Sequence, residues 1–272
     1  MKGRELRAGA LGAGALLLLA ILGPALAPHD PLEHIGFPAN ALRPPGGGFL
    51  LGTDDYGRDV LSRLLAGAPV SLGIGFASAA LAVSLGTILG AAAGFRGGAL
   101  EAVLLRFVDL LLAFPRIVLL LLLVALFDRS IPLLVLVIGA TGWMQTARIV
   151  RAEVASLRER PFVEAGRALG LSGSRLLFRH VLPNCAAPIL VSASLAVGTG
   201  ILLEASLSFL GLGVPPPAPS WGWMLKEGRD VLRQAPWISI FPGLMILLSV
   251  VAFQGLADGL RRTFAARTRP EA

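Results

Sequence analysis

The chain has 272 residues, of which 55% are hydrophobic and only 15% are charged, and its formal net charge is +7. A water-soluble domain needs more charge on its surface, so this composition predicts a membrane protein. The arginines lie beside apolar segments without the interleaved aromatic residues of a nucleic-acid platform, which excludes a nucleic-acid partner. A single cysteine, Cys185, and the lack of any Cys/His ligand spacing predict neither a disulfide nor a metal site.

The first apolar segment covers residues 8–27 and is long enough for one membrane-spanning helix of about 20 residues. The basic residues before it predict a cytoplasmic N-terminus by the positive-inside rule. Ala25-Leu26-Ala27 also fits a signal-peptide cleavage site, an alternative that the polytopic remainder of the chain disfavours. Residues 28–63 are polar and rich in proline and glycine, which predicts an external loop.

Five more apolar segments follow, each long enough to cross about 30 Å of hydrocarbon. We expect the second span to begin near Pro69 and the third to be kinked at Pro115. The predicted spans after the first are 69–95, 101–127, 131–150, 186–210 and 238–260. Arginines concentrate in residues 151–185 and in the tail, 261–272, which predicts a cytoplasmic location for both.

These segments predict an all-α polytopic membrane protein with six transmembrane helices and both termini in the cytoplasm. An N-terminal helix and its external loop, residues 1–63, precede a five-helix core, residues 64–260.

The arginine-rich segment between the fourth and fifth spans is amphipathic. Residues 162–169 read as a short helix, with Gly170 as its left-handed C-terminal residue. Ser172 or Ser174 can cap a second short helix that ends at Pro183. Helices this short are marginal in water and must pack against something. The residues alone leave two interpretations open. One is a basic hairpin on anionic lipid, and the other is a knob that fits a groove on a soluble partner, with Gly166 and Gly170 allowing that partner to approach closely.

This segment resembles the EAA loop of binding-protein-dependent ABC importer permeases. The loop's pattern is Glu-Ala-Ala, three residues, Gly, nine residues and Ile-x-Leu-Pro. The chain keeps that pattern, in register, at Glu164, Ala165, Gly170, Leu182 and Pro183. Gly166 replaces the second alanine and His180 replaces the isoleucine.

The resemblance extends to four other segments, which are similar to the dipeptide, oligopeptide and nickel permease subfamily. These segments are residues 51–72, 204–213, 219–225 and 241–261. The family implies a type I ABC importer permease fold and a multi-pass protein of a bacterial or archaeal cytoplasmic membrane. It also implies three kinds of partner: a second homologous permease subunit, two cytoplasmic ATPase subunits and an extracytoplasmic solute-binding protein.

The chain contains no G-x-x-x-x-G-K-[ST] phosphate loop, so it cannot hydrolyse ATP by itself. The resemblance therefore implies that ATP and Mg²⁺ bind to the partner ATPases, that this chain binds no cofactor, and that the EAA-like segment transmits the energy. The residues expected to couple to the ATPases are Phe162, Glu164, Ala165, Gly166, Gly170, Leu182 and Pro183.

Candidates for contact with the solute-binding protein lie in the two predicted external loops, 28–63 and 211–234. They are Asp54, Arg58, Asp59, Trp221 and Trp223. The alternative interpretation is local: the charges can pair with each other at a helix start, and tryptophans are common anchors at a membrane interface.

Glu204 lies within the fifth span, where a carboxylate is costly and is a candidate for gating or for a structural hydrogen bond or ion pair. Arg106, Asp109 and Arg116 are interpreted as interfacial salt links. His29 and His34 suggest a nickel site, but the intervening proline disfavours ligand geometry and favours a solvated loop.

Two rival functions fit less well. An ion-coupled secondary transporter needs buried ionisable residues in several spans, and a membrane enzyme needs a catalytic motif that the chain does not contain. Within the importer family the sequence favours di- or oligopeptides as the substrate, with nickel or another small solute as the alternative.

Overall fold

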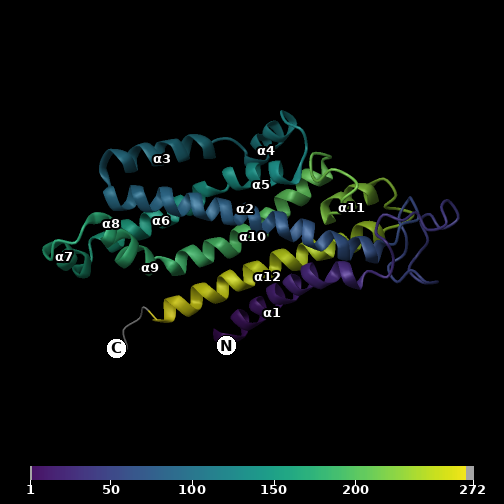
Figure 1. Ribbon diagram of the computed structural model, residues 1–272, viewed down its shortest axis with the longest axis horizontal. Helices are drawn as coiled ribbons and strands as arrows, with labels where there is room; N and C mark the ends of the chain where they lie inside the picture. Colours follow the sequence, from purple (N-terminus) through teal and green to yellow (C-terminus); the bar gives the residue numbers. More distant parts are fainter. Residues whose placement is uncertain (1, 268–272) are drawn as a thin grey trace.

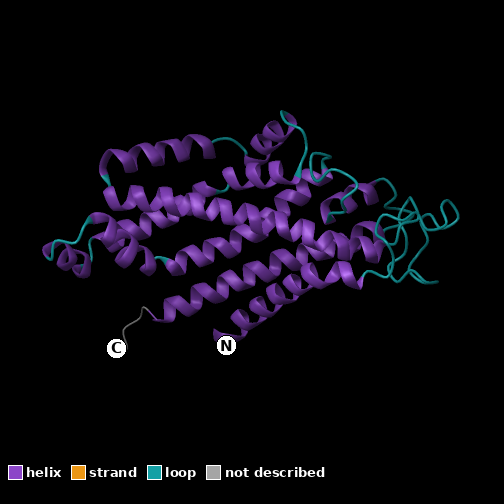
Figure 2. Ribbon diagram, in the orientation of Figure 1, coloured by secondary structure: helices purple, strands orange, loops and turns teal. Residues whose placement is uncertain are grey.

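The computed structural model describes residues 2–267, with the side chains of residues 6–264 (Figure 1). The described residues form helices and no β-strand (Figure 2). Among them, five helices are long and apolar enough to cross a membrane, and one bent pair of helices is a sixth candidate. The predicted all-α polytopic class is therefore confirmed. Residues 268–272 of the predicted basic tail lie outside the described residues.

The helices are, in chain order, α1 (Lys2–Leu22), η1 (Gly23–Leu26), α2 (Val60–Arg96), α3 (Gly98–Leu112), α4 (Arg116–Ala125), α5 (Ile131–Ala140), α6 (Trp143–Arg158), α7 (Pro161–Ala168), α8 (Gly173–Leu176), η2 (Leu177–Val181), α9 (Leu182–Asn184), α10 (Ala186–Phe209), α11 (Trp221–Arg229) and α12 (Trp237–Arg267). The segment from α7 to α9 is called the hairpin segment, and the end of the bundle that carries it is the hairpin end. Residues 27–59 and α11 form the opposite, loop end (Figure 1).

The second span begins earlier than predicted. Asp59 caps α2, because its carboxylate accepts a hydrogen bond from the Ser62 backbone N–H at 3.0 Å. Pro69 therefore lies inside the helix instead of starting it. A good N-cap is worth about 1 kcal/mol, and here it fixes the helix start nine residues before the proline.

The third predicted span, 101–127, bends at Pro115 as expected, and the bend is sharp enough to separate it into two helices. α3 and α4 meet at an angle of 80°, with the break just before Arg116. Pro115 has no N–H and disfavours a helical conformation at Phe114, which explains the position of the break. The fourth span also differs from its prediction, because it breaks at Thr141 and Gly142 between α5 and α6 and then continues to Arg158.

Glycines allow the helices to approach closely. Gly86, Gly90 and Gly94 lie one turn apart on α2 and face α6. A Cβ at Gly90 would lie 2.5 Å from the Ala147 carbonyl oxygen, and one at Gly94 would lie 2.5 Å from the Arg151 carbonyl oxygen. The backbones of α2 and α6 are thus in direct contact, as in small-residue interfaces between membrane helices.

α10 packs between α2 and α12, and α1 lies antiparallel to α12 (Figure 1). The start of α1 faces the end of α12, because Gly9 packs on Leu256 and Gly259 packs on Leu6. α1 therefore begins, and α12 ends, toward the hairpin end. The fifth predicted span matches α10 to within one residue, and the sixth continues past residue 260 as part of α12.

Candidate functional site

The hairpin segment begins with α7, which occupies the expected residues to within one position and protrudes at the extremity of the bundle (Figure 1). Pro161 stands at its first turn, where its missing N–H costs nothing. Val163 and Gly166 are buried, whereas Phe162 and Glu164 are exposed. The helix thus has an inner face that packs on the bundle and an outer face that is open.

Gly170 ends α7 as predicted, with a φ of +75°. Its N–H bonds to the Arg167 oxygen at 2.9 Å, and the Leu171 N–H bonds to the Gly166 oxygen at 3.1 Å. This pair of bonds is the Schellman arrangement, which satisfies carbonyls that the end of a helix leaves free. It also turns the chain back toward the bundle.

The second half of the hairpin segment is a continuous helical stretch in which α8, η2 and α9 follow one another without a gap. Of the two predicted caps, Ser172 is the one used, since its hydroxyl accepts from the Arg175 N–H at 3.4 Å. The prediction that Pro183 ends this helix is wrong. The chain widens into the π-helix η2, where the Leu182 N–H bonds to the Leu177 oxygen, and continues through Pro183 into α9.

A small apolar cluster, the hairpin core, joins the hairpin segment to three long helices. Its fully buried members are Val163 of α7, Val181 of η2, Cys185, and Val150 and Val154 of α6, and Ala91 of α2 lies among them. Burying one such side chain stabilises the packed arrangement by about 1.5–3 kcal/mol. The hairpin segment is therefore anchored to the bundle and does not lie loosely beside it.

Gly166 serves a different purpose from the one expected. It was expected to allow a partner to approach, but it faces inward, and a Cβ built there would lie 2.6 Å from Leu176 Cδ2. Leu176 is 1% exposed and occupies this space. The residue that departs from the EAA pattern is therefore part of the hairpin's own packing, and this expectation is wrong.

The outer face of the hairpin segment combines apolar and acidic groups. Leu169 is 82% exposed, Phe178 is 67% exposed and Phe162 is 42% exposed. Ala165 is also exposed, as is Pro183, while Leu182 is half-buried. No ion pair joins Glu164 to any described cation. Arg167, Arg175 and Arg179 are exposed in the same segment, so this surface is apolar and mixed in charge. Such a surface suits a partner that offers an apolar groove and a basic group opposite Glu164.

A cluster of four charged side chains organises the loop end. Arg58 lies 2.6 Å from Asp54 and 3.0 Å from Glu227, and Arg63 lies 2.6 Å from Glu227 and 3.3 Å from Asp54. Trp223 adds an indole N–H to Glu227 at 3.1 Å. Burial alone would lower the pKa of Arg58, but the carboxylates of Asp54 and Glu227 outweigh it and raise that pKa. We call this group the charge cluster.

Three of the candidates for binding-protein contact are buried. Asp54 is 1% exposed, and Asp59 and Trp221 are fully buried. Asp59 caps α2, and the Trp221 indole donates to the Leu64 oxygen at 3.0 Å. Direct contact through these three side chains is therefore wrong, because each is used inside the fold.

Glu204 is fully buried where α2, α10 and the start of α11 meet. It accepts hydrogen bonds from Ser208 at 2.7 Å and from Ser71 at 3.2 Å, and Ser71 in turn accepts from the Trp221 backbone N–H. Of the two roles considered for Glu204, these contacts support the structural hydrogen bond. Its partners tie α11 to the spanning helices.

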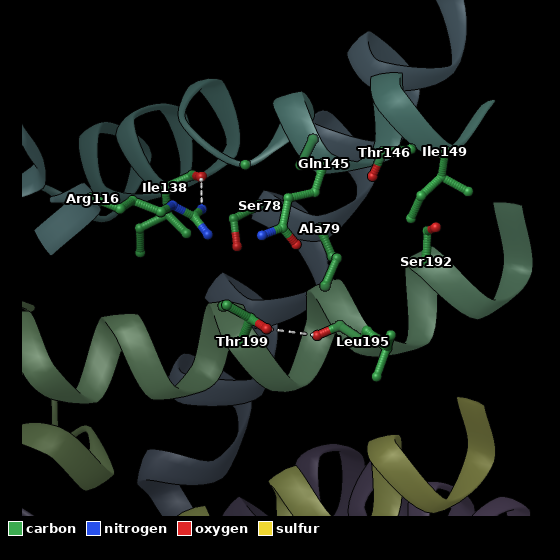
Figure 3. Close-up of a pocket in the computed structure, with 14 residues that line it drawn as sticks. Ser78, Ala79, Arg116, Ile138, Gln145, Thr146, Ile149, Ser192, Leu195 and Thr199 are labelled. Atoms are coloured by element: carbon green, nitrogen blue, oxygen red, sulfur yellow. Dashed lines mark hydrogen bonds between the residues drawn. The ribbon is translucent and has the colours of Figure 1, made fainter. Parts of the chain in front are cut away.

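The predicted salt links divide into two cases. Asp109 does pair with Arg148, and both side chains are exposed. Arg116 instead donates to the Ile138 carbonyl oxygen at 2.9 Å and to Thr141 Oγ1 at 3.4 Å, and no acidic side chain in the described chain pairs with it. A salt link is thus wrong for Arg116. Figure 3 shows its guanidinium at the edge of a cavity lined by several helices.

The histidines of the loop end do not form a metal centre. Within the described residues, no group of three or more His, Cys, Asp or Glu side chains could hold a metal ion. His29 lies 3.4 Å from Asp59, and His34 packs edge-on against Phe37 and Tyr56.

The bundle of spanning helices with a protruding, anchored hairpin defines a membrane permease. Residues 83–269 match the family described as the inner membrane component of binding-protein-dependent transport systems, and the chain belongs to this family. It is 42% identical to the di/tripeptide transport system permease protein DppC of Pseudomonas aeruginosa, over 93% of this chain and 86% of that protein. It is 40% identical to the dipeptide transport system permease protein DppC of Alkalihalophilus pseudofirmus, over 91% of this chain and 81% of that protein. Identity to the oligopeptide transport system permease protein OppC of Bacillus subtilis is 38%, over 93% of this chain and 83% of that protein.

The chain is therefore a multi-pass permease subunit of an ABC importer in the cytoplasmic membrane. It is a transport subunit and not an enzyme, and ATP hydrolysis belongs to separate ATPase partners.

Proposed function

We propose that this permease carries di- or oligopeptides and forms half of the translocation pathway beside a second, homologous permease subunit. The printed names of three relatives at 38–42% identity, which describe dipeptide, di/tripeptide and oligopeptide transport, support this substrate class. A solute-binding protein delivers the peptide outside, and two ATPase subunits that bind ATP and Mg²⁺ supply the energy inside.

The hairpin end faces the cytoplasm in this proposal, together with both termini. Arginines support the orientation, because they are dense in residues 148–179 and again at the end of α12. The loop end then faces outward. There the binding protein contacts the exposed side chains of the external segment, such as Leu50 and Tyr56, and Trp223 at the edge of α11, while Arg58 holds this surface in place.

The ATPases dock on the outer face of the hairpin segment. The observation that carries this proposal is the two-sided form of α7: Val163 is anchored in the hairpin core, while Phe162, Glu164 and Ala165 face away from it. Closing of the ATPase pair on ATP then moves α7 as a rigid body, and the core passes that movement to α6 and α10.

The test is co-purification of the ATPases with membrane-inserted permease variants. Glu164→Lys reverses the charge that meets the partner's basic group, and Gly170→Asp strains the left-handed turn that places α7. Either change should abolish ATPase association and peptide transport while membrane insertion continues.

Asp258→Lys is the matched control, because Asp258 is an exposed carboxylate near the same end of the bundle on α12. It should leave the complex intact. Recovery of a complete complex with Glu164→Lys or Gly170→Asp would contradict docking on the hairpin segment.

A further inference from the structure

A cavity of about 80 Å³ with several polar groups in its lining lies near the middle of α2 and α10, beside the breaks in the third and fourth spans (Figure 3). Its polar lining comes from separate helices: Ser78 of α2, Arg116 of α4, Gln145 and Thr146 of α6, and Ser192 and Thr199 of α10. Neither Glu204 with its serine partners nor the hairpin segment contributes to this cavity.

Two broken spans create the cavity's cationic edge. Arg116 is the first residue of α4, directly after the 80° bend. At the other break, the Gly142 N–H bonds to the Gly139 oxygen, which leaves the Ile138 oxygen without its usual helical donor. Arg116 donates to that oxygen at 2.9 Å. Arg116, at the first break, and Gly142, at the second, both line the cavity.

The guanidinium is held by one edge and open at the other. Nη2 donates to the Ile138 oxygen and Nε donates to Thr141 Oγ1. Nη1 has no hydrogen bond to a described residue. No carboxylate in the described chain neutralises the cation. A half-buried arginine inside a spanning segment is costly without an anion, so its position calls for one.

A second group in the cavity also lacks a partner. Ser192 is 7% exposed, and its hydroxyl oxygen is buried without a hydrogen bond within the described residues. Buried hydroxyls are nearly always satisfied in folded proteins. Gln145 is exposed, and its amide extends from α6 toward the side of the cavity where Ser78 lies (Figure 3). Figure 3 shows Ser78 and Gln145 between Arg116 and Ser192, so groups that can hydrogen-bond extend along the cavity from the guanidinium.

We propose that Arg116 binds the carboxylate of the transported peptide as it passes through the permease, which rests on the peptide function proposed above. A guanidinium edge matches a carboxylate in geometry and charge. A volume of about 80 Å³ is several times the roughly 10–15 Å³ that one water needs by the same measure, so a carboxylate fits in the cavity. The remainder of the peptide extends beyond the cavity. The site therefore recognises the terminal carboxylate and does not discriminate between peptide side chains.

The experiment uses the complete importer in proteoliposomes, with both permeases, the ATPases and the binding protein. The two probes are dialanine and dialanine amide, which differ only in the terminal carboxylate. Each is supplied as the preformed complex with the binding protein, so that the comparison reports the membrane step. We expect Arg116→Gln to lower dialanine uptake about tenfold, the size of one charge-assisted hydrogen bond, and to leave amide uptake unchanged.

Two further variants make the outcome decisive. Arg148→Gln removes an exposed arginine that pairs with Asp109 outside the cavity, and it should keep the wild-type ratio of acid to amide uptake. Arg116→Lys keeps a positive charge and should give a ratio of acid to amide uptake between those of the wild type and Arg116→Gln. The reason is that an ammonium group lacks the planar pair of N–H donors with which a guanidinium binds a carboxylate. If the importer with Arg116→Gln does not assemble, the ratio of acid to amide uptake in Arg116→Lys tests the proposal.

The outcomes separate the two proposals. An equal loss of acid and amide uptake in the Arg116 variants would overturn the carboxylate subsite and leave Arg116 as a structural residue. Failure of the wild-type importer to take up dialanine, and also a longer peptide such as tetraalanine supplied in the same way, would instead overturn the peptide function, and the proposed ligand of Arg116 with it.

Discussion

Gly166 and Gly170 lie one turn apart in the hairpin segment, and the reasons for their lack of a side chain differ. At Gly170 a Cβ would meet nothing within 4 Å, but the φ of +75° would cost any other L-residue about 1 kcal/mol or more. At Gly166 the backbone is ordinary, and the constraint is the end of Leu176, only 2.6 Å from a built Cβ. Because that atom belongs to a flexible side chain, an alanine is easier to accommodate at 166 than at 170.

Cys185 illustrates how the hairpin core controls the chemistry of a single residue. It is fully buried beside Val181, and burial, aided by Glu153, raises the pKa of its thiol from 9.0 to about 11. The thiolate is the reactive form. At pH 8 we therefore expect iodoacetamide to alkylate Cys185 in the folded protein roughly a hundredfold more slowly than in the denatured protein.

The same pKa shift gives stability a pH dependence. A folded-state pKa above the unfolded value stabilises the fold fully below about pH 9, and this contribution is lost as the pH rises toward about 11. The thermal midpoint should fall across that window, and Cys185→Ala should flatten this part of the profile. Rapid alkylation of the folded protein at pH 8 would contradict the burial of the thiol.

At the scale of elements, the charge cluster fastens α11 to the beginning of α2. Glu227 is the only contribution of α11 to the cluster's ion pairs in the described chain, and it meets both Arg58 and Arg63. Arg63 is 2% exposed, so removing its partner leaves a buried cation with only Asp54 near it. We expect Glu227→Gln to lower the free energy of unfolding by about 3 kcal/mol, the typical cost of breaking a buried pair.

Limited proteolysis of the detergent-purified protein checks this expectation, because residues 27–59 should become cleavable when α11 detaches. Glu33→Gln is the control, since Glu33 is an exposed carboxylate in the same external segment and makes no ion pair among the described residues. An unchanged unfolding midpoint and cleavage pattern in Glu227→Gln would contradict the fastening role.

The elements differ in how well the sequence predicts them, and the reasons are physical. Apolar length and arginine asymmetry are properties of single segments, so α10 could be placed to within one residue, and α7 could be placed with its terminal Gly170. The start of α2 and the continuation of the helix from η2 through Pro183 depend on particular pairs of hydrogen-bond donors and acceptors. The apolar pattern of the sequence does not indicate which groups pair. Likewise α11 is short and amphipathic, and it is held by partners from distant parts of the chain, such as Ser71.

The candidate sites divide in the same way. The hairpin residues were found because spacing within one segment carries the motif. The burial of Trp221 was missed because a contact across 150 residues or more, such as that with Leu64, is not encoded locally. Asp54 and Asp59 have local partners, Arg58 and Ser62, and these fit the alternative of pairing at a helix start. The cavity around Arg116 was missed for the same reason as the burial of Trp221, although a cation next to a proline break in an apolar span was an available signal.

At the scale of the whole molecule, the hairpin core connects α7, the proposed docking helix for the ATPases, to the helices that line the cavity. One end of the connection is α7, and the other is the α6–α10 pair, in which the first turns of α6 and the middle of α10 line the cavity. The backbone contact between α2 and α6 along Gly86, Gly90 and Gly94 leaves little freedom for these helices to slide separately. A displacement of α7 therefore acts on the cavity only if the hairpin core is tight.

Loosening that core should uncouple transport from ATP hydrolysis. Val163→Ala together with Val181→Ala removes methyl groups from two fully buried positions and weakens the packing by about 2 kcal/mol at each. The outer face with Phe162 and Glu164 is untouched, so the ATPases should still bind and hydrolyse ATP. Peptide uptake per ATP hydrolysed should fall several-fold in proteoliposomes, because α7 then moves without carrying α6. Val251→Ala, at a position 55% exposed on α12, should keep the wild-type ratio. An unchanged ratio in the double variant would mean that the movement reaches the cavity by another route.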